Sequence, residues 1–135
     1  MKISKSVIIG LSFLGLVALG YFGRILLNEA FSPVLSIEGE LYDFGVVDKG
    51  TAINFYLNLK NVGKSDLELL NVSTDCGCTV VDWQSLERIE PNGIDSLLIT
   101  YSTESSGGFN RKVIIETNTI DSPYIFYISG VVKEN

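Results

Sequence analysis

An alternation of apolar and polar side chains runs through the chain after residue 40 and restricts the folds open to it. In the clearest run, residues 53–60, every second residue from Ile53 to Leu59 is apolar and the residues between are mainly polar. Successive side chains of a β-strand point to opposite faces, so this run predicts a strand with one buried face. Comparable runs predict further strands at residues 42–47, 67–72, 79–81, 94–101, 111–117 and 124–132.

Turn-forming residues separate these runs. Gly, Pro, Asn, Asp and Ser cluster at residues 48–50, 61–64, 91–93, 105–108 and 121–123, and each has a backbone or side-chain property that favours turns. About seven short strands in roughly 100 residues predict an all-β domain, an antiparallel β-sandwich of two sheets. A small barrel is the competing architecture. One helix is expected, at the N-terminus.

The first 27 residues have the composition of a signal or transmembrane segment. Lys2 and Lys5 precede an uncharged apolar stretch from Val7 to Gly23, and Arg24 is the next charge. A helix that is apolar on every face is not expected to be exposed to water. A retained anchor needs roughly 20 residues, which the stretch from Val7 to Leu27 reaches if Arg24 extends its charge to the interface. Small residues within 18–20 fit signal-peptidase cleavage instead.

The sequence therefore predicts three parts. Residues 1–27 form a signal-anchor or a signal peptide, residues 28–35 form a linker, and residues 36–135 form the β-sandwich domain. Pro33 prevents a helix from continuing into the domain. Lysines ahead of the apolar stretch place the N-terminus in the cytoplasm, so the domain is expected to be periplasmic or extracellular on a single-pass anchor. Cleavage would release it as a soluble exported protein.

Charge and residue inventory exclude several functional classes. The whole chain has a net charge of −6. Residues 1–30 carry +2, so residues 31–135 carry −8. The basic residues of that acidic part form no cluster, which argues against a nucleic-acid partner. The chain has no histidine, so Ser-His-Asp and Cys-His catalytic sites are absent. We therefore expect no enzymatic activity, no cofactor and no identifiable small-molecule substrate.

The two cysteines, Cys76 and Cys78, are separated by Gly77 alone. In an extended strand their Cα atoms would lie about 6.5–7 Å apart, at the limit for a disulfide. A positive φ at Gly77 would bring the sulfurs together, with Asp75 and Thr79 supporting the turn. Such a pair could be a disulfide or redox-active dithiol, two inert structural thiols, or a weak metal site suited to Cu(I).

Several motifs occur in a fixed order along the exported part. They are Tyr42–Gly50, Asn61–Gly63, Leu67–Val72, Cys76-Gly77-Cys78-Thr79, Pro91–Gly93, Thr117–Asn118 and Ile128–Val131. In this order they resemble the bacterial domain of unknown function 1573, over about residues 36–133. The resemblance implies an immunoglobulin-like sandwich similar to ASH and major-sperm-protein domains, usually exported, and implies no activity. Asn92, inserted in the usual Pro-Gly turn, departs from the family pattern.

These observations favour a membrane-anchored, exported, non-enzymatic immunoglobulin-like module that acts through protein contacts in the cell envelope. The anchor implies contact with the membrane, and the sandwich offers edges and loops to a protein partner. The alternative is a thiol-redox or Cu(I)-handling protein that uses Cys76 and Cys78. A third hypothesis is a subunit of a larger envelope complex, held mainly through its helix.

Overall fold

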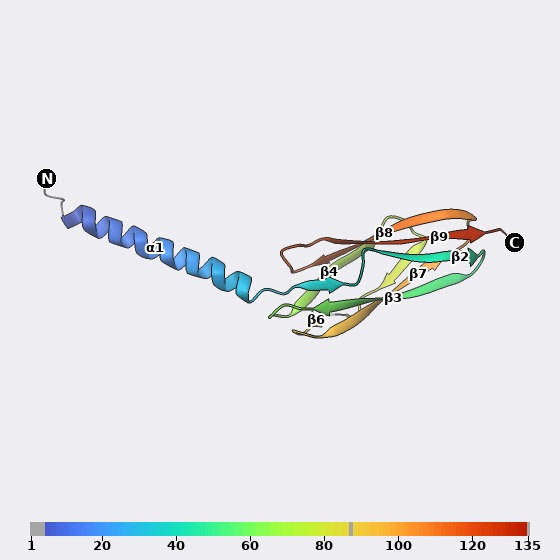
Figure 1. Ribbon diagram of the computed structural model, residues 1–135, viewed down its shortest axis with the longest axis horizontal. Helices are drawn as coiled ribbons and strands as arrows, with labels where there is room; N and C mark the ends of the chain where they lie inside the picture. Colours follow the sequence, from blue (N-terminus) through green and yellow to red (C-terminus); the bar gives the residue numbers. More distant parts are fainter. Residues whose placement is uncertain (1–4, 87, 135) are drawn as a thin grey trace. The chain divides into compact units, whose positions relative to one another are not determined.

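The computed structural model describes residues 5–86 and 88–134, and the positive charge expected at Lys2 lies outside them. The chain divides into two compact units, Met1–Ser32 and Pro33–Asn135. The first contains one helix and the second contains all the strands (Figure 1). The two units are described separately.

The helical unit is a single α-helix, α1, from Lys5 to Ala30. Its stretch Ile9–Leu27 is 19 residues long, has a mean hydropathy of 1.7 and buries none of its length, so it is long and apolar enough to cross a membrane. Large side chains along it are exposed, including Phe13 at 70% and Leu19 at 71%. The helix ends three residues before Pro33, whose ring disfavours helical geometry in the residue before it.

The second unit is a two-layer β-sandwich. One sheet has the strand order β1-β3-β7-β5 and the other has the order β2-β9-β8-β4-β6. The predicted β-sandwich with one N-terminal helix is therefore confirmed. The strands are β1 (Leu35–Ile37), β2 (Leu41–Asp48), β3 (Ala52–Asn61), β4 (Leu67–Thr74), β5 (Thr79–Asp82), β6 (Arg88–Ile89), β7 (Ile94–Ser102), β8 (Gly107–Thr117) and β9 (Tyr124–Lys133).

The expected number of strands was wrong, because the described residues form nine strands and not seven. All seven predicted runs fall within strands. The two additional strands, β1 and β6, contain three and two residues. Segments this short contain too few residues to display the alternation that marks a strand in sequence.

The expectation of a wholly antiparallel sandwich was also wrong at one strand pair. β2 runs parallel to β9, from Leu41 opposite Tyr127 to Asp48 opposite Lys133. Alternation reports which face of a strand is buried and carries no information on strand direction. A register shift interrupts this pair next to Gly45, which has a φ of 66°.

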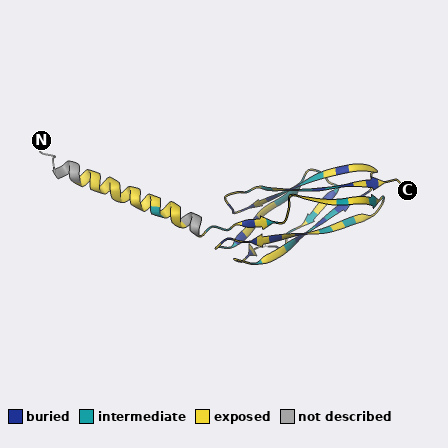
Figure 2. Cartoon of the chain, in the orientation of Figure 1, coloured by how far each residue is buried: buried dark blue, intermediate teal, exposed yellow. Residues whose placement is uncertain are grey.

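The core lies between the two sheets and is built from the apolar positions of the alternating runs (Figure 2). Leu57 and Leu59 of β3 are 2% and 0% exposed, so the predicted buried face of that strand is confirmed. Across the sandwich, the rings of Tyr101 and Phe109 stack with centroids 4.1 Å apart. Tyr101 is 4% and Phe109 6% exposed, which places this stack within the core.

A buried asparagine organises the end of the sandwich at which Pro33 begins the second unit. Asn61 has no exposed surface, and its side-chain amide donates to the carbonyls of Ser65 at 2.8 Å and Ile89 at 2.9 Å. Its side-chain oxygen accepts from the amide of Gly63 at 3.0 Å. The backbone carbonyl of Asn61 accepts from the amide of Asn92. Asn92 has a φ of 64°, a conformation that asparagine tolerates well.

Candidate functional site at the disulfide loop

The two cysteines lie in the loop where the chain crosses from one sheet to the other. This loop joins β4 of the five-stranded sheet to β5 of the four-stranded sheet. Backbone hydrogen bonds attach it to both layers: the amide of Asp75 donates to the carbonyl of Lys112 in β8, and the amide of Ser102 in β7 donates to the carbonyl of Cys78. The loop is thus held at two points of the framework.

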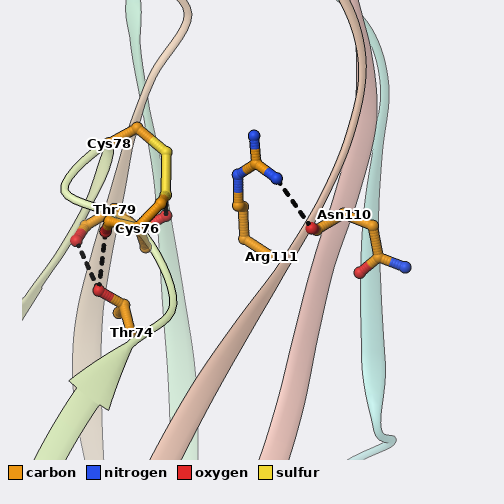
Figure 3. Close-up of a disulfide and its surroundings, with 6 residues drawn as sticks. All are labelled: Thr74, Cys76, Cys78, Thr79, Asn110 and Arg111. Atoms are coloured by element: carbon orange, nitrogen blue, oxygen red, sulfur yellow. Dashed lines mark hydrogen bonds between the residues drawn. A yellow bond between two sulfur atoms is a disulfide. The ribbon is translucent and has the colours of Figure 1, made fainter.

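Cys76 and Cys78 form a disulfide in the structure, with an S–S distance of 2.00 Å (Figure 3). Their Cα atoms are 5.3 Å apart, shorter than an extended strand allows and within the normal range for a disulfide. Both residues are partly exposed. In this state the pair consists of neither free thiols nor thiolate metal ligands.

The positive φ expected at Gly77 was wrong, although Gly77 lies in the turn. Gly77 is not among the glycines with positive φ, so the turn does not require the conformational freedom of glycine. An added Cβ at Gly77 would meet no heavy atom within 4 Å. The turn from Cys76 to Thr79, in which the amide of Thr79 donates to the carbonyl of Cys76, brings the two Cα atoms together without a positive φ at Gly77.

Two threonines hold the turn. The hydroxyl of Thr74 donates to the carbonyls of Cys76 at 3.0 Å and Thr79 at 3.1 Å (Figure 3). Thr79 is 4% exposed, and its hydroxyl lies 3.5 Å from the sulfur of Cys76. Thr79 and Asp75 belong to the predicted set, whereas Thr74 was missed. Its place as the last residue of a strand, directly before a turn, is a weak signal for such a bond.

A cavity of about 450 Å³ adjoins the disulfide. Arg111 of β8 contributes to its wall, and its guanidinium donates from Nη1 to the carbonyl of Asn110 at 3.2 Å (Figure 3). Its Nε is buried and has no hydrogen-bond partner among the described residues. The cavity is lined by Gly77, Cys78, Tyr101, Ser102, Glu104, Ser105 and Arg111.

Arg111 was not identified from the sequence as a site residue. It occupies an inward position of β8, between the buried Phe109 and Val113. A charged residue at the apolar phase of an alternating run is an available signal, because such a residue is rarely buried without a partner. Three or more His, Cys, Asp or Glu side chains able to hold a metal ion do not come together anywhere in residues 5–86 and 88–134.

The family model described as "Protein of unknown function (DUF1573)" matches residues 35–132. The chain belongs to this family. The match covers most of the sandwich, from the start of β1 to the next-to-last residue of β9. The family description states no activity, so membership establishes the domain type and leaves its biochemical role open.

Known proteins are similar to this DUF1573 chain in sequence or in fold. The chain is 31% identical to the mouse hydrocephalus-inducing protein over 108 residues, which are 78% of the chain and 2% of that protein. A protein of unknown function from Porphyromonas gingivalis W83 has a TM-score of 0.68 at 18% identity, over 77% of this chain and 49% of the other. The chain thus spans only part of both.

The likeness to ASH domains is confirmed. The ASH/PapD-like domain 7 of human CEP192 has a TM-score of 0.62 at 17% identity, over 77% of this chain and 88% of that domain. Major-sperm-protein family members of Caenorhabditis elegans share the fold as well. At these identities the likeness establishes the immunoglobulin-like fold alone.

Proposed function

We propose that this DUF1573 chain is a membrane-anchored, exported, non-enzymatic module that binds another protein of the cell envelope. The exposed apolar surface of α1 carries the proposal. Each large apolar side chain gains about 1.5–3 kcal/mol on leaving water, and no residue of Ile9–Leu27 is buried. In the proposed organisation residues 1–27 are the anchor, residues 28–35 the linker and residues 36–135 the exported domain.

The sandwich offers a groove to a protein partner. A cavity of about 720 Å³ is lined by residues of the segments 34–40 and 123–127 and by Val62. In the described part of the chain, the ladder between β2 and β9 begins only at Leu41 and Tyr127. The first three residues of β9, Tyr124–Phe126, are thus paired with β8 on one side and border the groove on the other.

The backbone of β9 supports strand addition as the binding mode. The amide of Tyr127 donates to the carbonyl of Glu40 at 2.8 Å, so it points away from β8. Backbone groups two residues apart in a strand point the same way, which directs the amide and carbonyl of Ile125 into the groove. An extended segment of an envelope protein could pair with these groups and place its side chains against the apolar lining.

A site-specific cross-linking experiment tests this proposal. A photoreactive amino acid is placed at position 125 of the full chain, and at position 94 as the control. Ile125 is 44% and Ile94 64% exposed. Ile94 is the first residue of β7 and Ile125 the second residue of β9, and both strands start near the same end of the sandwich. Ile94 does not line the groove. We expect one defined protein adduct in native membranes from position 125 and none from position 94. Equal adduct patterns, or none at position 125, would overturn the proposal.

A further inference from the structure

We propose that the cavity beside the disulfide binds a thiol compound that carries a carboxylate, and that Arg111 orients this compound for exchange with Cys76–Cys78. The site is separate from the groove at β9 and shares no lining residue with it. The inference therefore does not depend on the proposed binding of an envelope protein.

The hydrogen bonding of Arg111 indicates an anionic ligand. A guanidinium has five N–H donors, and the described hydrogen bonds use one of them, to the carbonyl of Asn110. Ion pairs in the described part of the chain join Lys49 to Glu134, Arg88 to Asp66 and Lys133 to Asp48, and none includes Arg111. A partly buried guanidinium without a carboxylate partner is complementary to a carboxylate supplied by a ligand.

The same cavity exposes the disulfide. Cys78 and Gly77 line it together with Arg111, so a ligand that pairs with the guanidinium lies in the same cavity as Cys78. Glu104 lines the cavity as well. Its negative charge disfavours a ligand carboxylate placed anywhere but at Arg111, which restricts the orientation in which the thiol group binds.

The exchange balances in two steps. The ligand thiolate attacks the sulfur of Cys78, the Cys76–Cys78 bond breaks, and its electron pair leaves on the sulfur of Cys76. The hydroxyl of Thr79, 3.5 Å from that sulfur, is placed to donate to the new thiolate. A second ligand thiolate then attacks the ligand sulfur of the mixed disulfide and releases Cys78. Two ligand thiols are oxidised to a disulfide, one protein disulfide is reduced, and both cysteine thiolates take protons from water.

The cavity lies at the end of the sandwich opposite the linker. The amide of Ser102 donates a hydrogen bond to the carbonyl of Cys78, and Ser102 pairs with Ala52 at one end of β3. Leu35, where the chain enters the domain, pairs with Asn61 at the other end of β3. The ten residues of β3 span about 30 Å. A dissolved thiol thus meets the disulfide at the end farthest from the point where the chain enters the domain.

The test measures the rate at which three small thiols reduce the native disulfide in the full chain in detergent. The thiols are 3-mercaptopropionate, 2-mercaptoethanol and cysteamine, which carry a negative charge, no charge and a positive charge, and each rate is corrected for its thiolate fraction. We expect the anionic thiol to react about fivefold faster than the neutral one. The domain carries a net −8 from residues 31–135, so its overall charge would produce the opposite order.

Two variants test whether Arg111 causes the faster reaction of the anionic thiol. Arg111→Gln should abolish this preference. Lys112→Gln changes the next residue of the same strand, on its other face, and should retain the preference. If Arg111→Gln does not fold, 0.5 M NaCl on the wild type should reduce the preference because salt screens charges. A wild type without anion preference toward both the small thiols and the peptides described next, an Arg111→Gln variant that keeps a preference, or a preference unaffected by salt would overturn the proposal.

A second arm distinguishes a small thiol from a cysteine in a peptide. The peptides acetyl-Asp-Cys-amide and acetyl-Asn-Cys-amide differ in one carboxylate. Faster reaction of the Asp peptide, lost in Arg111→Gln, supports the site and assigns it to an acid-flanked cysteine. Preference for 3-mercaptopropionate alone supports the site and assigns it to small thiols. Absence of an anion preference in both arms contradicts the site.

Discussion

The side-chain amide of Asn61 donates to the backbone carbonyl of Ile89 at a distance of 2.9 Å. The two residues belong to different sheets, because β3 lies in the four-stranded sheet and β6 at the edge of the five-stranded one. One fully buried polar side chain therefore ties the two layers together. Its removal would leave the carbonyls of Ser65 and Ile89 and the amide of Gly63 without this partner.

Asn61→Ala should lower the free energy of unfolding by about 2–4 kcal/mol, since buried polar groups lose their hydrogen bonds. Urea denaturation of the 33–135 domain measures the change. Asn58→Ala is the matched control, because Asn58 is on the exposed face of the same strand and should change stability by less than about 0.5 kcal/mol. Equal stability of the two variants would show that the Asn61 network contributes nothing.

Gly130→Ala should destabilise the sandwich through overpacking. A Cβ at position 130 would lie 2.8 Å from Cζ of Phe109 and 3.0 Å from the carbonyl oxygen of Gly45. Such crowding in a core typically costs about 1–3 kcal/mol. Gly108→Ala is the control, since a Cβ there meets no heavy atom within 4 Å and φ is not positive. Thermal unfolding that is unchanged in Gly130→Ala would contradict this prediction.

Gly77→Ala should keep both the fold and the disulfide. The backbone at Gly77 is outside the left-handed region and an added methyl group meets open space. Alanine at such a position raises the free energy of unfolding by up to about 1 kcal/mol, by reducing the freedom of the unfolded chain. Intact mass before and after thiol alkylation reports the disulfide. Alkylated cysteines in a folded Gly77→Ala variant would show that glycine is required.

The apolar helix should retain the chain in membranes. The full chain is expected in the membrane fraction after alkaline carbonate extraction, because Ile9–Leu27 is long and apolar enough to span a membrane. A chain of residues 33–135 should be soluble, with the same urea midpoint as the domain of the full chain, since that unit is compact by itself. Full-length protein recovered in the carbonate supernatant would contradict anchoring.

Much of the sandwich could be predicted from the sequence, because alternation reports burial directly. The run 53–60 predicted β3 and its buried face, and six further runs fall within strands. The direction of β2 could not be predicted, since its partner β9 is brought beside it by the tertiary fold. β6, which has two residues, contains too little sequence to form a pattern.

Of the candidate site, only the cysteine loop could be predicted from the sequence. Cys76 and Cys78 are two positions apart, so their proximity is local and visible in the sequence. Arg111 reaches the same cavity from β8, and no local pattern relates it to the cysteine loop. The backbone conformation of Gly77 was predicted wrongly, because glycine permits a positive φ without requiring one.

The parallel pair of β2 and β9 also sets the order in which the domain can be completed. Leu41 pairs with Tyr127, 86 positions later in the chain, and β9 is the strand with which β2 forms its ladder in the described residues. During synthesis the β2 segment stays without its strand partner until almost the whole domain has been made, and contacts so distant in sequence are slow to form. The five-stranded sheet is therefore completed at this edge only after β9 has been made, so a chain that ends before Tyr127 lacks the strand with which β2 pairs.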